Sequence, residues 1–205
     1  MLDPVQRYYS TKLAEHGPTA RGVDWNDEGS QELRFEQLLK VCDPEPSFTV
    51  NDYGCGYGAL ALYLERHGYR FEYVGFDIAR EMLSTAQELT RDVPGCRYVD
   101  DESLLEAADY TVASGIFNVK LEADDAAWTE HVFGTLRQLD ALSRRGFSFN
   151  MLTSYSDRER MRPDLHYADP RVIFDCCKRE FSRWVALLHD YGLYEFTVLV
   201  RKDVE

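Results

Sequence analysis

The stretch VNDYGCGYGAL, residues 50–60, decides the fold. Gly54, Gly56 and Gly58 alternate with other residues directly after a short apolar run and an aspartate, Asp52. Glycine tolerates positive φ angles and lets a ligand lie directly against backbone N–H groups. When such a loop follows a parallel strand, it faces the ligand crevice of an open α/β sheet, and the next helix points its positive end at the same place. The stretch therefore predicts a ligand-binding loop at the carboxyl end of a first strand.

Strand and helix patterns alternate along the chain around this loop. Apolar runs predict strands at residues 48–50, 71–76, 96–99, 108–114 and 147–152. Helical patterns between and after them cover residues 59–67, 79–90, 124–143 and 170–181. Two further helices, at 3–15 and 30–42, precede the first strand, the second with Ser30 as its N-cap. This alternation predicts a parallel sheet with helices on both faces.

The end of the chain breaks the alternation. Two apolar runs, residues 185–188 and 196–200, are separated only by residues 189–195. Because no helix fits into this gap, the two runs should pair as an antiparallel hairpin. The sequence therefore predicts seven strands, of which only the last runs antiparallel to the others.

Acidic residues follow the first three strands. Asp52 is placed to meet a cationic amine, Asp77 to accept from two ribose hydroxyls, and Asp100-Asp101 to accept from an adenine amino group. The glycines also fit G-x-G-x-x-A, the dinucleotide-binding fingerprint. A dinucleotide-binding fold explains Asp77, but it gives no reason for Asp52, for the acid after the third strand or for the terminal hairpin. Two ordinary interpretations stay open: Asp52 as a helix-capping or loop acid, and Asp77 as an N-cap of the helix that begins at Ala79.

At these residues the sequence resembles the class I S-adenosylmethionine-dependent methyltransferases. The resemblance rests on D-x-G-x-G-x-G at residues 52–58, the acids Asp77 and Asp101, and the closing hairpin, and it extends from about residue 48 to 202. It implies a Rossmann-like, doubly wound α/β sheet with strand order 3-2-1-4-5-7-6 and strand 7 antiparallel. It also implies S-adenosyl-L-methionine as cofactor and S-adenosyl-L-homocysteine as product.

The resemblance further implies where the cofactor lies. Gly54 and Gly56 would pack against its methionine part, with Asp52 near the amino group. Asp77 would hold the ribose and Asp101 the adenine, with Asp100 as the alternative if the third strand ends one residue earlier. The predicted cofactor-binding residues are Asp52, Gly54, Cys55, Gly56, Gly58, Asp77, Ile78, Asp100, Asp101, Glu102, Ser114 and Gly115.

Residues for the methyl acceptor are expected in two segments that the common core does not explain, residues 16–25 and 153–169. Methyl transfer from a sulfonium is an in-line displacement that depends mainly on alignment, so no catalytic triad is required. His166 and Tyr167 are the first candidates, with His166 as a candidate base because its unperturbed pKa is about 6.5. The alternative for His166 is an ordinary surface-loop histidine. The two segments are expected to close over the cofactor together and to enclose a small acceptor.

Length and composition define the remaining expectations. The 205 residues suit one domain, here divided into an N-terminal helical cap (1–45) and a core (46–205). A net charge of −13 disfavours a nucleic-acid partner. Five cysteines without a C-x-x-C pair argue for reduced thiols and against a metal site.

The sequence therefore predicts a soluble cytoplasmic methyltransferase acting on a small molecule, with no membrane association, since it shows neither a signal-peptide pattern nor a membrane-spanning apolar run. Four alternatives remain. They are an RNA acceptor, a protein acceptor, an S-adenosylmethionine-binding protein without transfer activity and, less favoured, a nicotinamide-dependent oxidoreductase.

Overall fold

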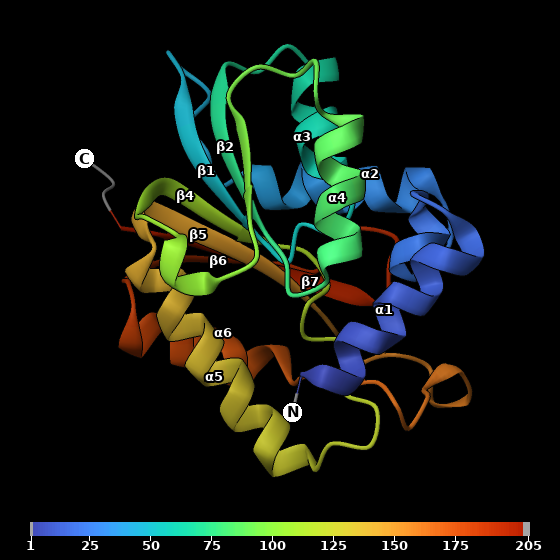
Figure 1. Cartoon of the computed structure of the whole chain (residues 1–205). Coiled ribbons are helices and arrows are strands. Elements are labelled where there is room, and N and C mark those ends of the chain that lie inside the picture. The colour runs from blue at the N-terminus through green and yellow to red at the C-terminus, as the bar shows by residue number, and fades with distance from the viewer. Residues whose placement is uncertain (1, 203–205) are drawn as a thin grey trace.

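A seven-stranded sheet with the order β3-β2-β1-β4-β5-β7-β6 forms the centre of the computed structural model, which describes residues 2–202 (Figure 1). The strands are β1 (Phe48–Tyr53), β2 (Phe71–Phe76), β3 (Cys96–Val99), β4 (Ala108–Ala113), β5 (Ser143–Leu152), β6 (Trp184–Leu188) and β7 (Glu195–Arg201). Strands β1 to β5 pair in parallel, whereas β7 pairs antiparallel with both β5 and β6. The predicted strand order and the single antiparallel strand are confirmed, and no helix separates β6 from β7.

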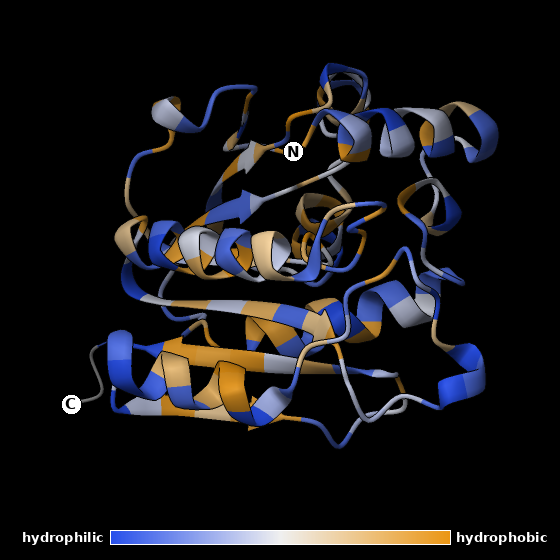
Figure 2. Ribbon diagram, turned by 90° about the horizontal axis from the view of Figure 1, so that it is seen from below, coloured by the Kyte–Doolittle hydropathy of each residue, from blue (hydrophilic) through white to orange (hydrophobic). Residues whose placement is uncertain are grey.

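Helices cover both faces of this sheet (Figure 1). They are α1 (Asp3–His16), α2 (Glu28–Leu39), α3 (Ala59–Arg66), α4 (Arg80–Leu89), α5 (Asp125–Ala141) and α6 (Pro170–Glu180). One face packs against α5 and α6 through a core that includes Trp128 and Phe147. The other packs against α2, α3 and α4 around Leu64 and Tyr73. The central strands are mostly apolar, while the helices carry both hydrophobic and hydrophilic residues (Figure 2).

The start of α2 differs from the predicted start at Ser30. The helix begins two residues earlier, and Asp27 is the N-cap, accepting a hydrogen bond of 2.7 Å from the Ser30 N–H. The Ser30 hydroxyl in turn accepts from the Asp27 N–H, which completes a capping box. Aspartate and serine are both favourable N-cap residues. The reciprocal hydrogen bonds place Asp27 at the N-cap and Ser30 in the first turn of the helix.

Helix α1 crosses the carboxyl edge of the sheet (Figure 1). Its Val5 is buried in the same core cluster as Trp128 of α5, and its Ser10 hydroxyl donates to Glu81 of α4 at 3.2 Å. Because α1 contacts helices on both faces of the sheet, it covers the carboxyl edge, where the ligand-binding loops lie. None of the helices within residues 2–202 has the length and apolarity needed to cross a membrane.

Candidate active site

A cavity of about 210 Å³ lies between the carboxyl edge of the sheet and α1. Its walls are the loops after β1, β2 and β4, and its roof is α1 with Val23 and Trp25. The lining consists of Leu2, Val5, Tyr9, Val23, Trp25, Tyr53, Gly54, Gly56, Phe76, Asp77, Ile78, Met82, Glu102, Ser114, Gly115, Ile116, His131 and Thr135. Seven of the predicted cofactor-binding residues thus meet at one site: Gly54, Gly56, Asp77, Ile78, Glu102, Ser114 and Gly115.

A smaller cavity of about 40 Å³ adjoins the first. Asp52 and Cys55 line it, and both residues are buried. The residues that line both cavities are Val23, Trp25, Gly54, Gly56 and Ser114. The predicted residue Gly58 lines neither cavity and is instead the N-cap of α3.

The glycine loop turns sharply at the end of β1. Gly54 has a φ of 84°, and both its N–H and that of Cys55 donate to the carbonyl oxygen of Phe76, at 2.8 and 2.9 Å. A Cβ atom at position 54 would overlap the side chain of Ile116, which follows β4. Both the backbone angle and the close approach therefore require glycine.

We expect Gly54→Ala to weaken cofactor binding at least about tenfold, because strain at a positive φ and the clash with Ile116 displace the loop. Isothermal titration with S-adenosylhomocysteine measures the effect. Gly134→Ala is the matched control, since this glycine lies within α5 with open space around its Cα, and alanine there should leave binding unchanged. Equal affinities for both variants would contradict the role of the loop.

Asp77 ties the loops after β1 and β2 together. One carboxylate oxygen accepts from the Gly56 N–H at 2.9 Å, and the other accepts from the Ala79 N–H at 2.9 Å. Burial raises its pKa, while these backbone donors oppose the increase. Asp77 is therefore both a loop-capping residue and a wall of the cavity, and each oxygen retains a lone pair for a ligand hydroxyl.

Asp52 is held beneath the glycine loop. The residue is 3% exposed, and its carboxylate accepts a hydrogen bond of 2.7 Å from the Tyr73 hydroxyl. Burial raises the pKa of Asp52 to about 7, against the lowering effect of the Tyr73 bond. A buried carboxylate with one neutral donor is suited to pairing with a cationic group of a ligand.

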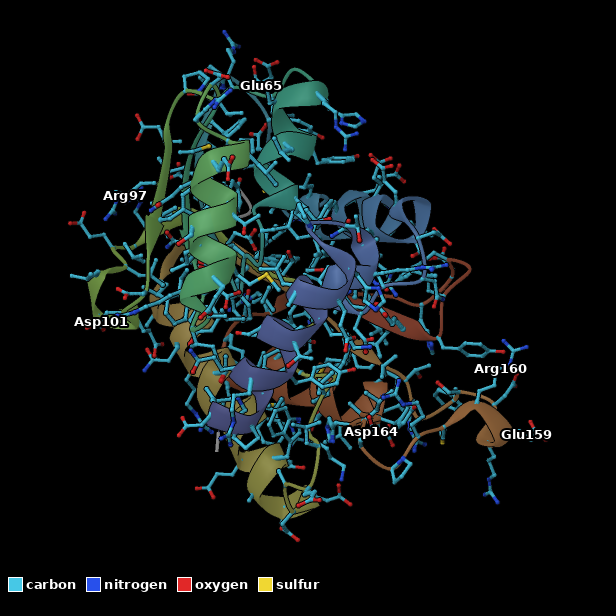
Figure 3. The ribbon with its side chains drawn as sticks, turned by 45° about the vertical axis from the view of Figure 1, so that its right-hand side comes forward. Glu65, Arg97, Asp101, Glu159, Arg160 and Asp164 are labelled. Atoms are coloured by element: carbon cyan, nitrogen blue, oxygen red, sulfur yellow. The ribbon has the colours of Figure 1, made fainter. Side chains whose placement is uncertain are left out.

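The acid after β3 is placed differently from the sequence prediction. Asp101 is exposed and caps its own turn, accepting from the Ser103 N–H at 2.9 Å, and Figure 3 shows it at the margin of the molecule. Asp100 pairs with Arg80 at 3.0 Å, also in solvent. Because Asp101 starts the 3₁₀ turn Glu102–Leu104, the next residue, Glu102, faces inward and lines the cavity.

Two polar atoms of the cavity wall lack partners. Among the residues that the structure describes, three buried side-chain polar atoms have no hydrogen-bond partner, and two of them, Glu102 Oε1 and Ser114 Oγ, belong to this wall. An unpaired buried polar group costs stability, so such atoms mark places where a ligand is expected to bind. The Glu102 carboxylate lines the same cavity as Ile78 and Asp77, and this set suits an adenosine group. The glycine loop and Asp52 suit the amino acid group of the same ligand. The residues present therefore fit S-adenosylmethionine.

Several cavity residues were not among the predicted site residues. His131 and Thr135 lie one turn apart on α5, Tyr53 follows Asp52 on β1, and Met82 lies on α4. Burial lowers the pKa of His131, which favours the neutral form of its ring. Only the four-residue spacing of His131 and Thr135 on one helix could have indicated a shared face.

His166 and Tyr167 do not line the cavity. The His166 N–H donates to the carbonyl oxygen of Asn118 at 2.8 Å, and burial lowers the pKa of its ring. The Tyr167 hydroxyl accepts from the Arg162 N–H at 3.0 Å. The loop after β5 thus lies against the segment that follows β4, and its tip, with Arg160, points into solvent (Figure 3).

Among residues 2–202, no group of three or more histidine, cysteine or acidic side chains is arranged to hold a metal ion.

Comparisons with known proteins agree with this geometry. The family model described as a methyltransferase domain matches residues 50–138. A Mycobacterium tuberculosis protein, Rv1506c, described as a candidate methyltransferase, is 51% identical over 166 residues, which are 81% of this chain and 98% of that protein. Identity at this level over nearly the whole relative shows a shared family.

Solved methyltransferase structures have the same fold at low sequence identity. The N-methyltransferase NodS from Bradyrhizobium japonicum, solved with S-adenosylhomocysteine, is 13% identical, with a TM-score of 0.68 over 98% of this chain and 99% of that chain. Magnesium protoporphyrin IX methyltransferase from Synechocystis, also solved with S-adenosylhomocysteine, is 13% identical, with a TM-score of 0.58 over 97% of this chain and 84% of that chain. The chain belongs to the class I methyltransferases, which take their methyl group from S-adenosylmethionine and release S-adenosylhomocysteine.

Proposed function

We propose that the protein transfers a methyl group from S-adenosylmethionine to a small-molecule acceptor. The observation that carries this proposal is the roof formed by α1, Val23 and Trp25 over the cavity. A roof over the cavity favours an acceptor small enough to enter it over an RNA helix or a folded protein, which would need an open face. The net charge of −13 also disfavours a nucleic-acid acceptor.

The proposed cofactor position follows from the two cavities. The larger one, with Asp77, Ile78 and Glu102, suits the adenosine, and the smaller one, with Asp52, suits the amino acid end. Since the sulfur joins these two parts, it belongs at the junction that both cavities share, beside Trp25.

The chain contributes mainly alignment and exclusion of water. S-adenosylmethionine supplies a methyl group on a positively charged sulfur, and an acceptor must approach in line with that bond. Val5, Val23 and Met82 give the cavity an apolar wall, which strengthens electrostatic interactions inside it. In this proposal the segment after β4 faces the acceptor. His166 supports that segment from the side away from the cavity, because its backbone N–H donates to the Asn118 carbonyl oxygen. Alignment of this kind can supply several kcal/mol of the barrier.

A labelling experiment tests the class of acceptor. The protein is incubated with S-adenosylmethionine tritiated in its methyl group and a mycobacterial extract, chosen because the 51% identical relative is mycobacterial. The extract is then divided into small molecules, RNA and protein. We expect protein-dependent label among the small molecules. Label confined to RNA or protein would contradict the proposal, and a heat-denatured sample serves as the control.

The pKa of Asp52 makes cofactor binding depend on pH. In the free protein this carboxyl group has a pKa raised to about 7, and a bound ammonium favours its charged form, so binding lowers the pKa and releases a proton. Affinity should therefore weaken by up to about tenfold per pH unit below about 7. Titrations across this range measure the slope. Asp52→Asn should bind more weakly with a flatter pH profile, and an unchanged slope would contradict the assignment.

In this proposal residues 1–45 act as the cap and residues 46–205 as the catalytic core. The five cysteines are unpaired, which supports a reducing compartment such as the cytoplasm.

A further inference from the structure

Five residues form a closed ring of contacts beside the cavity. The Gly115 N–H donates to Asn150 Oδ1 at 2.7 Å, and Asn150 Nδ2 donates to Glu195 Oε2 at 2.8 Å. The Arg34 guanidinium donates to both Glu195 oxygens, at 2.5 to 3.1 Å, and lies 3.7 Å from the centre of the Trp25 ring. The same indole packs so closely on Gly115 that a Cβ atom there would overlap it.

The charged pair in this ring is withdrawn from water. Arg34 is 5% exposed and Glu195 is 1% exposed. Arg34 comes from α2 and Glu195 from the start of β7, elements that are far apart in sequence. Removing two charges from water is costly, and apolar residues of similar size are often at least as stabilising. The pair therefore calls for an explanation other than stability.

The position of the ring suggests that explanation. Trp25 lines both cavities and therefore borders the junction at which we place the sulfur of the cofactor. The guanidinium of Arg34 lies directly against this indole. A positive charge that close to a cationic sulfonium, in a site that excludes water, would repel it strongly unless a negative charge balances it.

We propose that Glu195 neutralises Arg34 and thereby sets the preference of the site for S-adenosylmethionine over S-adenosylhomocysteine. The two molecules share their adenosine and amino acid groups, but only the first carries the positive charge on sulfur. Glu195 is thus a specificity-determining residue that acts through charge, while Arg34 positions Trp25. The inference rests on the proposed place of the sulfur.

The variant Glu195→Gln tests this charge directly. Glutamine keeps a carbonyl oxygen for Arg34 and Asn150 but removes the negative charge. Isothermal titration should show the ratio of the two dissociation constants, S-adenosylmethionine over S-adenosylhomocysteine, rise on the order of tenfold. Damage to the fold weakens both ligands alike and leaves this ratio unchanged. Glu180→Gln, in the exposed pair with Arg137 at 3.0 Å, is the matched control and should leave the ratio at its wild-type value.

A double variant completes the test. Glu195→Gln combined with Arg34→Met removes both charges, so the ratio should return to within about twofold of the wild type. An unchanged ratio in Glu195→Gln, or a ratio that stays raised in the double variant, would overturn the inference. Wild-type protein that binds neither molecule would overturn the cofactor site itself, and the inference with it. The two failures are therefore distinguishable.

Discussion

Replacing Asp77 with alanine is expected to weaken cofactor binding by more than tenfold. Two effects combine. A charged acceptor for the ribose hydroxyls is lost, and each such bond contributes on the order of 1.5–3 kcal/mol. The Gly56 N–H, which donates to Asp77 at 2.9 Å, also loses its partner, so the glycine loop loosens. Titration of S-adenosylhomocysteine into a variant with wild-type secondary structure measures the loss.

The acids after β3 provide controls for this result. Asp101→Ala should change affinity by less than about twofold, because this carboxylate faces solvent and caps its own turn. Glu102→Ala should weaken binding by roughly tenfold, because its inward oxygen has no partner in the free protein. Unchanged affinity for folded Asp77→Ala would refute the ribose assignment. A larger effect at Asp101 than at Glu102 would place the adenine beside Asp101, the residue that the resemblance favours for this role.

Replacing Arg34 with methionine should produce the largest loss of stability. Removing one partner of a buried ion pair leaves the other charge uncompensated, at a cost of about 3–5 kcal/mol. For a chain of this size the melting temperature should fall by roughly 6–20 °C. Thermal unfolding followed by circular dichroism measures the change. The expected loss of stability is large because Glu195 is 1% exposed and, without Arg34, keeps only Asn150 as a side-chain donor.

An exposed ion pair provides the comparison. Arg137→Met breaks the pair with Glu180, which water screens, so it should cost less than about 1 kcal/mol. Equal melting temperatures for Arg34→Met and Arg137→Met would show that Glu195 is not held by Arg34 in solution.

Most of the fold could be predicted from the sequence because its signals are local. The apolar runs, the glycines after the first strand and the short gap between the last two strands predict the elements, the parallel sheet and the terminal hairpin, whereas the strand order came from the resemblance to the methyltransferase family. The boundaries were less predictable. At α2, Asp27 and Ser30 are both good caps, and only the reciprocal bond between them decides where the helix begins.

The candidate site could be predicted only in part. Gly54, Gly56 and Asp77 lie at strand ends, so topology alone brings them together. The choice of Glu102 over Asp101 depends on the direction of a three-residue turn, which the order of acids does not encode.

The ring that joins Arg34, Asn150 and Glu195 was not predictable from the sequence, since it unites α2, β5 and β7 without a motif. The position of His166 was not predictable either. A polar loop after β5 was expected to overhang the cavity, whereas this histidine lies outside the lining, bound to the backbone of Asn118.

A crystal structure with S-adenosylhomocysteine tests the central claim most directly. We predict the adenine beside Glu102 and Ile78, the ribose on Asp77, the amino group at Asp52, and the sulfur against Trp25 beneath α1. An adenine bound elsewhere, or a sulfur remote from Trp25 and Gly54, would contradict the account of this site.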